Sequence, residues 1–262
     1  FQSSLRNAPS GAWDMSKNKD SSILAWMDNG DLYVAANGKI APDSSARSLF
    51  SDFRNLEKID FGNCFDTSNV TDMDSMFSGC SGLVSLDISS FDTFNVTRMF
   101  SMFEGCHSLA SLDLSGFDTS GVTTMSFMFQ DCSSLTSLDL SNFDTSSVEK
   151  MAFLFYGCTG LTRLNISSFN TSSAEDIAYM FADCSSLTRL NLSNFNTSNV
   201  TDMTALFSGC SGLTSLNLRN FDTSNVTEMA YMFYKCSKLT DLDISSFVTS
   251  YGTNMESMFS YC

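Results

Sequence analysis

Histidine, clustered basic residues and long apolar runs are all scarce in this sequence, and each scarcity excludes a class of protein. Histidine occurs once, at His107, so no Cys-His pair or Ser-His-Asp triad recurs along the chain. The 14 Lys and Arg residues are scattered, and 29 Asp and Glu residues leave a net charge of −15. Nucleic-acid binding needs clustered basic residues, so we expect no nucleic-acid partner. No run approaches the roughly 18 apolar residues of a membrane span.

Motifs for catalysis and metal binding are also lacking. The sequence contains neither a P-loop nor a dinucleotide-binding fingerprint. Its cysteines form no CxxC pair and have no histidine partners, which soft metal sites require. The acidic residues lie in columns along the repeats and do not face one another across a cleft. The sequence therefore predicts that the protein is not an enzyme and holds no cofactor or metal ion.

A nearly regular repeat of 26 residues runs through most of the chain, in which 43% of residues are hydrophobic. Two columns define it. Phenylalanine recurs at Phe65, Phe91, Phe117, Phe143, Phe169, Phe195, Phe221 and Phe247. Cysteine recurs at Cys80, Cys106, Cys132, Cys158, Cys184, Cys210, Cys236 and Cys262. Such self-similarity is typical of solenoids, whose units must stack to bury their apolar faces.

Each unit contains two periodicities. Leu86 and Ile88 alternate with polar neighbours, which is the signature of a short strand with one buried face. The stretch Met73–Cys80 carries apolar residues at i, i+3, i+4 and i+7, the spacing of one helical stripe. The sequence therefore predicts an α/β solenoid, a leucine-rich-repeat-like stack of strand, loop and short helix with one parallel sheet.

The array is expected to begin near residue 46, where a degenerate copy of the unit precedes the regular ones. Residues 1–45 contain both tryptophans and both prolines, with hairpin signals at Asn29-Gly30 and Asn37-Gly38. We interpret 1–45 as an N-terminal cap and 46–262 as the solenoid. Its last unit is incomplete, which favours a natural polypeptide that continues beyond Cys262. The open apolar end leaves end-to-end self-association into a filament as an alternative.

The consensus FDTSxVTxMxxMFxxCxxLxxLxLSx resembles the BspA-like leucine-rich repeat surface proteins of bacteria, a repeat also common in mycoplasma surface proteins. The resemblance covers nearly the whole chain. It implies an extracellular or cell-surface, adhesin-like binding module whose partner is a host or extracellular-matrix protein.

The cysteine column has two interpretations, a disulfide or metal ladder and a row of small buried hydrophobic residues. Successive units are expected to lie too far apart for the roughly 4.4 to 6.8 Å between Cα atoms that a disulfide needs. We therefore predict that Cys80 through Cys262 are reduced and buried.

Two surfaces are candidate binding sites. On the predicted helix, the second and fifth positions after the first Met project away from the core, and aromatic residues replace Ser there in the middle and late units. This helix-side patch is predicted to contact a protein partner through Phe127, Phe153, Tyr156, Tyr179, Tyr231 and Tyr234. The alternative is the strand face, whose acidic and basic side chains suit a polar or glycan ligand. Its residues are Asp87, Asp113, Asp139, Arg163, Arg189 and Arg219.

Two further functions remain alternatives from other classes. Aspartate columns at Asp87 and Asp92 bring carboxylates within a strand spacing of each other, where calcium would bridge them, although no DxDxDG loop is present. A threonine column from Thr67 to Thr249 would suit ice binding. The simpler interpretation is that each Thr satisfies backbone amides in its own turn.

Overall fold

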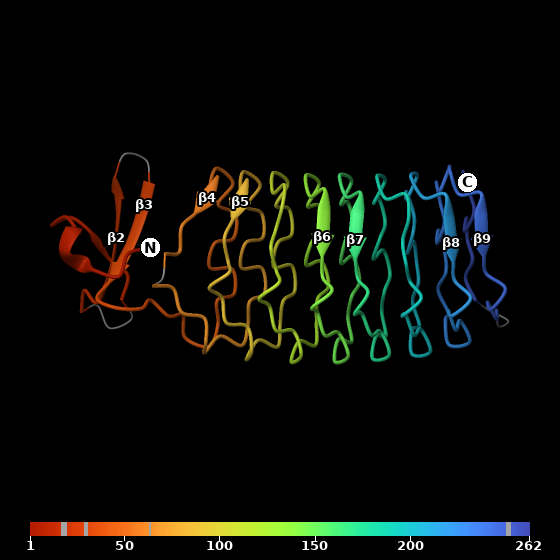
Figure 1. Ribbon diagram of the computed structural model, residues 1–262, viewed down its shortest axis with the longest axis horizontal. Helices are drawn as coiled ribbons and strands as arrows, with labels where there is room; N and C mark the ends of the chain where they lie inside the picture. Colours follow the sequence, from red (N-terminus) through yellow and green to blue (C-terminus); the bar gives the residue numbers. More distant parts are fainter. Residues whose placement is uncertain (17–19, 29–30, 63, 250–252) are drawn as a thin grey trace.

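The structure is a computed structural model that describes residues 1–16, 20–28, 31–62, 64–249 and 253–262. Figure 1 shows an elongated stack of similar coils with a small antiparallel sheet at its N-terminal end. Parallel backbone bridges join residues one repeat apart, such as Arg98 and Thr124, so each coil is one unit of the sequence. The predicted repeat solenoid is therefore confirmed.

The N-terminal sheet has the order β1-β2-β3 and is antiparallel throughout. Its strands are β1 (Trp13–Asp14), β2 (Ile23–Asp28) and β3 (Asp31–Ala36), preceded by one turn of 3-10 helix, η1 (Leu5–Asn7). β2 and β3 are adjacent strands of a hairpin, and the predicted turn at Asn29-Gly30 lies outside the described residues. The ring of Phe1 packs 5.3 Å from that of Phe61, which joins this sheet to the first coils.

Short parallel strands lie along one edge of the stack, here named the strand edge (Figure 1). They form three pairs, β4 (Lys58–Ile59) with β5 (Ser85–Leu86), β6 (Ser137–Asp139) with β7 (Arg163–Asn165), and β8 (Ser215–Asn217) with β9 (Asp241–Asp243). Within the described residues, the coils at 110–114 and 188–192 make no backbone hydrogen bonds to the strands on either side. The prediction of one parallel sheet was therefore wrong, because every third coil interrupts it.

The predicted helix is also wrong, since the described residues contain no α-helix. Met73–Cys80 forms consecutive four-residue turns, in which the amides of Met76, Ser78 and Cys80 each donate to a carbonyl three residues earlier. An α-helix needs bonds to the fourth residue back. Ser75 and Gly79 have φ values of 56° and 74°, and these left-handed residues redirect the chain. Buried residues at 73, 76, 77 and 80 thus keep helical spacing without a helix.

The turn segments form a second edge, here named the turn edge, with continuous hydrogen bonding between coils. The amides that the turns leave free point along the stack, so Ser75 donates to the carbonyl of Phe100 at 2.7 Å and Phe77 to that of Met102 at 2.9 Å. A row of parallel bridges begins at Ser45↔Asp72 and reaches Glu228↔Asn254. Every second turn amide therefore serves cohesion between units, as a sheet ladder does.

The core consists of the predicted inward columns. Met73, Met76 and Phe77 are fully buried, and their equivalents are buried in every later coil except the last, where Met255 and Phe259 are exposed. The column that begins at Phe77 stacks ring on ring, with centroids 5.7 Å apart between Phe77 and Phe103. This regular stacking explains why one aromatic residue recurs at the same place in every coil.

The cysteines are free, and those from Cys80 to Cys236 are buried, which confirms the prediction for them. Cys262 is exposed, contrary to the prediction. Each thiol from Cys80 to Cys262 donates to a phenylalanine carbonyl of the preceding coil, as Cys132 does to Phe103 at 3.1 Å. Burial raises the pKa of the thiols of Cys106, Cys158 and Cys236 to about 12.

The threonine column lies inside the stack. The Thr93 hydroxyl donates to the carbonyl of Asp118 at 2.9 Å and accepts from the amide of the same residue at 2.8 Å. Thr67, Thr145, Thr171, Thr197 and Thr223 make the same pair of bonds to the coil that follows. The hydroxyls from Thr67 to Thr223 satisfy backbone groups and are buried, so they are not displayed as a flat surface for ice.

Candidate functional site

The aromatic patch lies on the turn edge, at a position where every coil adopts a left-handed backbone. Positive φ values from 50° to 64° recur along this column, at Ser48, Ser75, Ser101, Phe127, Phe153, Tyr179, Ala205, Tyr231 and Ser257. Glycine adopts this conformation at the lowest cost, whereas a bulky residue there costs about 1 to 3 kcal/mol. Four coils nevertheless carry Phe or Tyr.

The rings of neighbouring coils stack on one another. The ring centroids of Phe127 and Phe153 lie 4.7 Å apart, and those of Phe153 and Tyr179 lie 4.5 Å apart. The interplanar angle is 6° in both pairs. Tyr156 meets Phe153 edge to face at 5.6 Å. We name these four residues the aromatic ladder. Each stacked pair contributes about 0.5 to 1.5 kcal/mol, which offsets the backbone cost.

A hollow of about 500 Å³ runs beside the ladder. Its lining includes the rings of Phe127 and Phe153 and the charged residues Lys150 and Asp176. Burial raises the pKa of Asp176, and the carboxylate of Asp202 adds to the effect. The surface next to the ladder is therefore amphipathic.

A buried carboxylate holds two of the residues that line this hollow, Arg98 and Phe100. The Asp74 side chain is fully buried, and it accepts hydrogen bonds from Arg47 at 2.7 Å and from Arg98 at 2.7 and 2.9 Å. It also accepts the amide of Phe100 at 2.8 Å. This network ties three coils together and uses the charge of Arg98 within the fold.

A second group of rings lies farther along the same edge. Tyr234 packs edge to face against Tyr231 at 5.7 Å and against Tyr261 at 5.4 Å. The Tyr231 hydroxyl donates to Glu256 at 2.6 Å, and this hydrogen bond raises the pKa of Tyr231. We name these three tyrosines the C-terminal ring cluster. Ala205 holds the left-handed position between the two groups.

The structure thus divides the predicted patch in two and leaves all six of its residues half-buried. The positions were expected to project fully into water, but ring contacts between and within coils partly cover them. Sequence reasoning missed Phe100, whose ring lies 5.2 Å from Phe127, and Tyr261. Phe100 departs from the small residue found at its position in later units, such as Ser126 and Ala152, which was the available signal.

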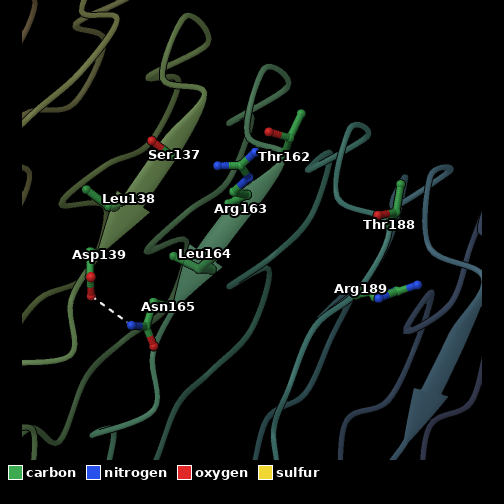
Figure 2. Close-up of a pocket in the computed structure, with 9 residues that line it drawn as sticks. All are labelled: Ser137, Leu138, Asp139, Thr162, Arg163, Leu164, Asn165, Thr188 and Arg189. Atoms are coloured by element: carbon green, nitrogen blue, oxygen red, sulfur yellow. Dashed lines mark hydrogen bonds between the residues drawn. The ribbon is translucent and has the colours of Figure 1, made fainter.

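The alternative surface lies on the strand edge, where a hollow of about 660 Å³ opens between β6, β7 and the following coil. Figure 2 shows its lining, with Arg163 on β7 and Arg189 on the next coil. Asn165 donates to Asp139 at 2.9 Å across the strand pair. The structure brings Asp139, Arg163 and Arg189 together, whereas Arg219 is held elsewhere by an ion pair with Asp243.

The aspartate columns of the strand edge and the adjoining loops form turns within their own coils. Asp87 and Asp113 each accept the amide of the serine two residues later, at 3.1 and 2.9 Å. Hydrogen bonds from those serines lower the pKa of both carboxyls. Among the described residues, no group of three or more His, Cys, Asp or Glu side chains is arranged to hold a metal ion.

Among the residues that the structure describes, no helix is both long and apolar enough to cross a membrane.

The fold and its edges define a repeat solenoid in which tandem turns replace the helix and two surfaces are candidates for binding. A family model described as "Mycoplasma protein of unknown function, DUF285" matches residues 44–163, 123–216 and 188–262. The chain belongs to this family, which confirms the mycoplasmal part of the resemblance. No curated protein matches the chain significantly.

Proposed function

We propose that this chain is an extracellular or cell-surface binding module that uses its turn edge to contact a protein partner. The contact surface comprises Phe127, Phe153, Tyr156, Tyr179, Tyr231 and Tyr234. The resemblance to BspA-like surface proteins supports an adhesin-like role with a host or extracellular-matrix protein as partner.

One observation carries this proposal. Phe127, Phe153 and Tyr179 occupy consecutive left-handed positions, with φ from 58° to 64°, where Ser or Gly would cost less backbone energy. Their rings are half-buried and prearranged by stacking, so a partner would meet them with little loss of side-chain entropy. Rigid Phe and Tyr anchors beside a polar row are typical of protein-binding hot spots.

The proposal is tested by surface plasmon resonance of the purified chain against a panel of purified extracellular-matrix proteins. For a protein that binds, Phe153→Ser and Tyr179→Ser should each weaken affinity by about 30-fold, the equivalent of about 2 kcal/mol. Phe153→Ser loses two stacked neighbours and Tyr179→Ser loses one, so stability should fall by about 1 to 3 kcal/mol and about 0.5 to 1.5 kcal/mol respectively while both variants stay folded. Melting curves measured in parallel separate the two effects.

Phe94→Ser is the matched control. Phe94 is 69% exposed, and Ser stands at its position in other coils, as at Ser68 and Ser120. This variant removes an exposed ring without touching the ladder, so it should bind like the unmodified chain. The proposal would be overturned if Phe153→Ser and Tyr179→Ser bound as tightly as Phe94→Ser, or if the unmodified chain bound no member of the panel.

A further inference from the structure

We infer that the strand-edge hollow between Arg163 and Arg189 binds an oligosaccharide that carries a single carboxylate or sulfate group. This site is separate from the turn edge and does not depend on the function proposed for it. Its lining comes from three successive coils and comprises Ser137, Leu138, Asp139, Thr162, Arg163, Leu164, Asn165, Thr188 and Arg189.

The two arginines depart from the repeat. Ser stands at their position in other units, as at Ser111, Ser137 and Ser215. Both arginines are exposed and line the same hollow from adjacent coils. Figure 2 shows their side chains diverging, as two like charges should.

Neither guanidinium is neutralised within the part of the chain that the structure describes. The net charge is −15, yet no carboxylate forms an ion pair with Arg163 or Arg189. Other arginines are paired, Arg98 with Asp74 and Arg219 with Asp243. An acidic ligand group in the hollow would offset this uncompensated positive charge and accept charge-assisted hydrogen bonds from these exposed side chains when they turn toward it.

The rest of the lining suits a sugar. Its polar groups include the hydroxyls of Ser137 and Thr162 and the amide of Asn165, whereas Leu164 alternates with Arg163 and Asn165 along β7 and packs against the core. The Thr188 hydroxyl and the backbone of 188–192 make no hydrogen bonds to neighbouring strands among the described residues, so their donors are available to ligand oxygens. Hydroxyls, amides and a small apolar surface are the groups that orient a polar ligand.

The flanking charges limit the ligand to one acidic group. Asp139 lies within the hollow, and Asp113 and Asp241 stand on strand-edge positions of nearby coils. Closely spaced phosphates, as in a nucleic-acid duplex with one charge per about 1.7 Å of axis, would meet these carboxylates. An oligosaccharide with one acid among neutral sugars places its charge on the arginines alone.

The test is an NMR titration of the whole chain with three probes, sialyllactose, lactose monosulfate and lactose. We expect sialyllactose or the sulfate to bind at least fivefold more tightly than lactose, and the probe that does so identifies the acid. Arg163→Ser and Arg189→Ser install the residue found in other coils, so they should fold, and each should remove that preference.

Arg219→Ser is the matched control because it removes the same charge from the same edge at a residue already paired with Asp243. It should leave binding unchanged within twofold. The inference is overturned if lactose binds as tightly as both acidic probes, if Arg219→Ser weakens binding as much as Arg163→Ser, or if no probe shifts resonances of 162–165 and 188–191. Phe153→Ser should bind the sugars normally, which keeps this outcome independent of the turn edge.

Discussion

Individual polar side chains in this solenoid mostly serve the backbone of a neighbouring coil. Thr145 illustrates the pattern, since its hydroxyl donates to the carbonyl of Asn170 and accepts its amide, at 2.9 and 2.8 Å. A single buried hydroxyl thus satisfies two main-chain groups that no other contact reaches. Substitutions in this column should therefore affect stability far more than their size suggests.

We expect Thr145→Val to lower the free energy of unfolding by about 2 to 3 kcal/mol, because it keeps the shape of the side chain but leaves a buried donor and acceptor unpaired. Urea denaturation followed by circular dichroism measures the change. Thr145→Ser keeps the hydroxyl and should cost less. Thr249 is exposed, so Thr249→Val should be nearly neutral, and a large effect there would contradict this account.

The cysteine column predicts alkaline sensitivity. Burial raises the pKa of Cys106, Cys158 and Cys236 from 9.0 to about 12. Between pH 9 and 12 the unfolded chain loses thiol protons that the folded chain keeps, so unfolding becomes more favourable as pH rises. The stability is fully present below pH 9, and each of these thiols should cost about 1.4 kcal/mol by pH 10.

Urea midpoints measured from pH 8 to pH 10.5 test this expectation. Cys158→Ala should flatten the fall in stability, whereas Cys262→Ala should not, since Cys262 is exposed. A folded chain whose buried thiols react with a thiol reagent at pH 8 as fast as Cys262 would show that the column is open to solvent.

At the scale of the element, the sequence predicted which residues face inward but not the backbone that places them there. The spacing of Met73, Met76, Phe77 and Cys80 is shared by a helical stripe and by tandem turns, so periodicity could not separate the two. The deciding feature is the left-handed conformation of Ser75, and Ser carries no sequence signal for it. The stacking of Phe153 with its neighbours could not be predicted either, because it depends on the same left-handed conformation.

The two edges also differ in how many amides are paired, and hydrogen exchange should report this. The Phe129 and Phe155 amides donate to the next coil at 3.0 and 2.9 Å, whereas those of Leu112 and Leu190 make no bond to the adjacent coils. We expect the first two to exchange on the order of 100-fold more slowly than the second two. Equal protection factors in an NMR exchange series would show that the strand edge is continuous in solution.

For the whole molecule, the repeat was the part of the fold most open to prediction, because each coil contacts mainly its neighbours. It follows that one complete unit is dispensable. Deleting residues 143–168 joins Asn142 to Phe169, which recreates the junction between Asn142 and Phe143. We expect this variant to fold with an unchanged circular dichroism spectrum per residue and a lower urea midpoint, while deletion of residues 143–155 alone should unfold the stack. The reverse result would mean that the coils are not equivalent.

The interruption of the strand edge at every third coil has a mechanical consequence. Bending that opens the strand edge at 110–114 or 188–192 breaks no backbone hydrogen bond, whereas bending that opens the turn edge breaks several in each coil. The turn edge should therefore resist bending, whereas the strand edge should bend most easily at the two interruptions. Under a pulling load, the strand edge would yield first and by small steps, while the turn edge kept its register.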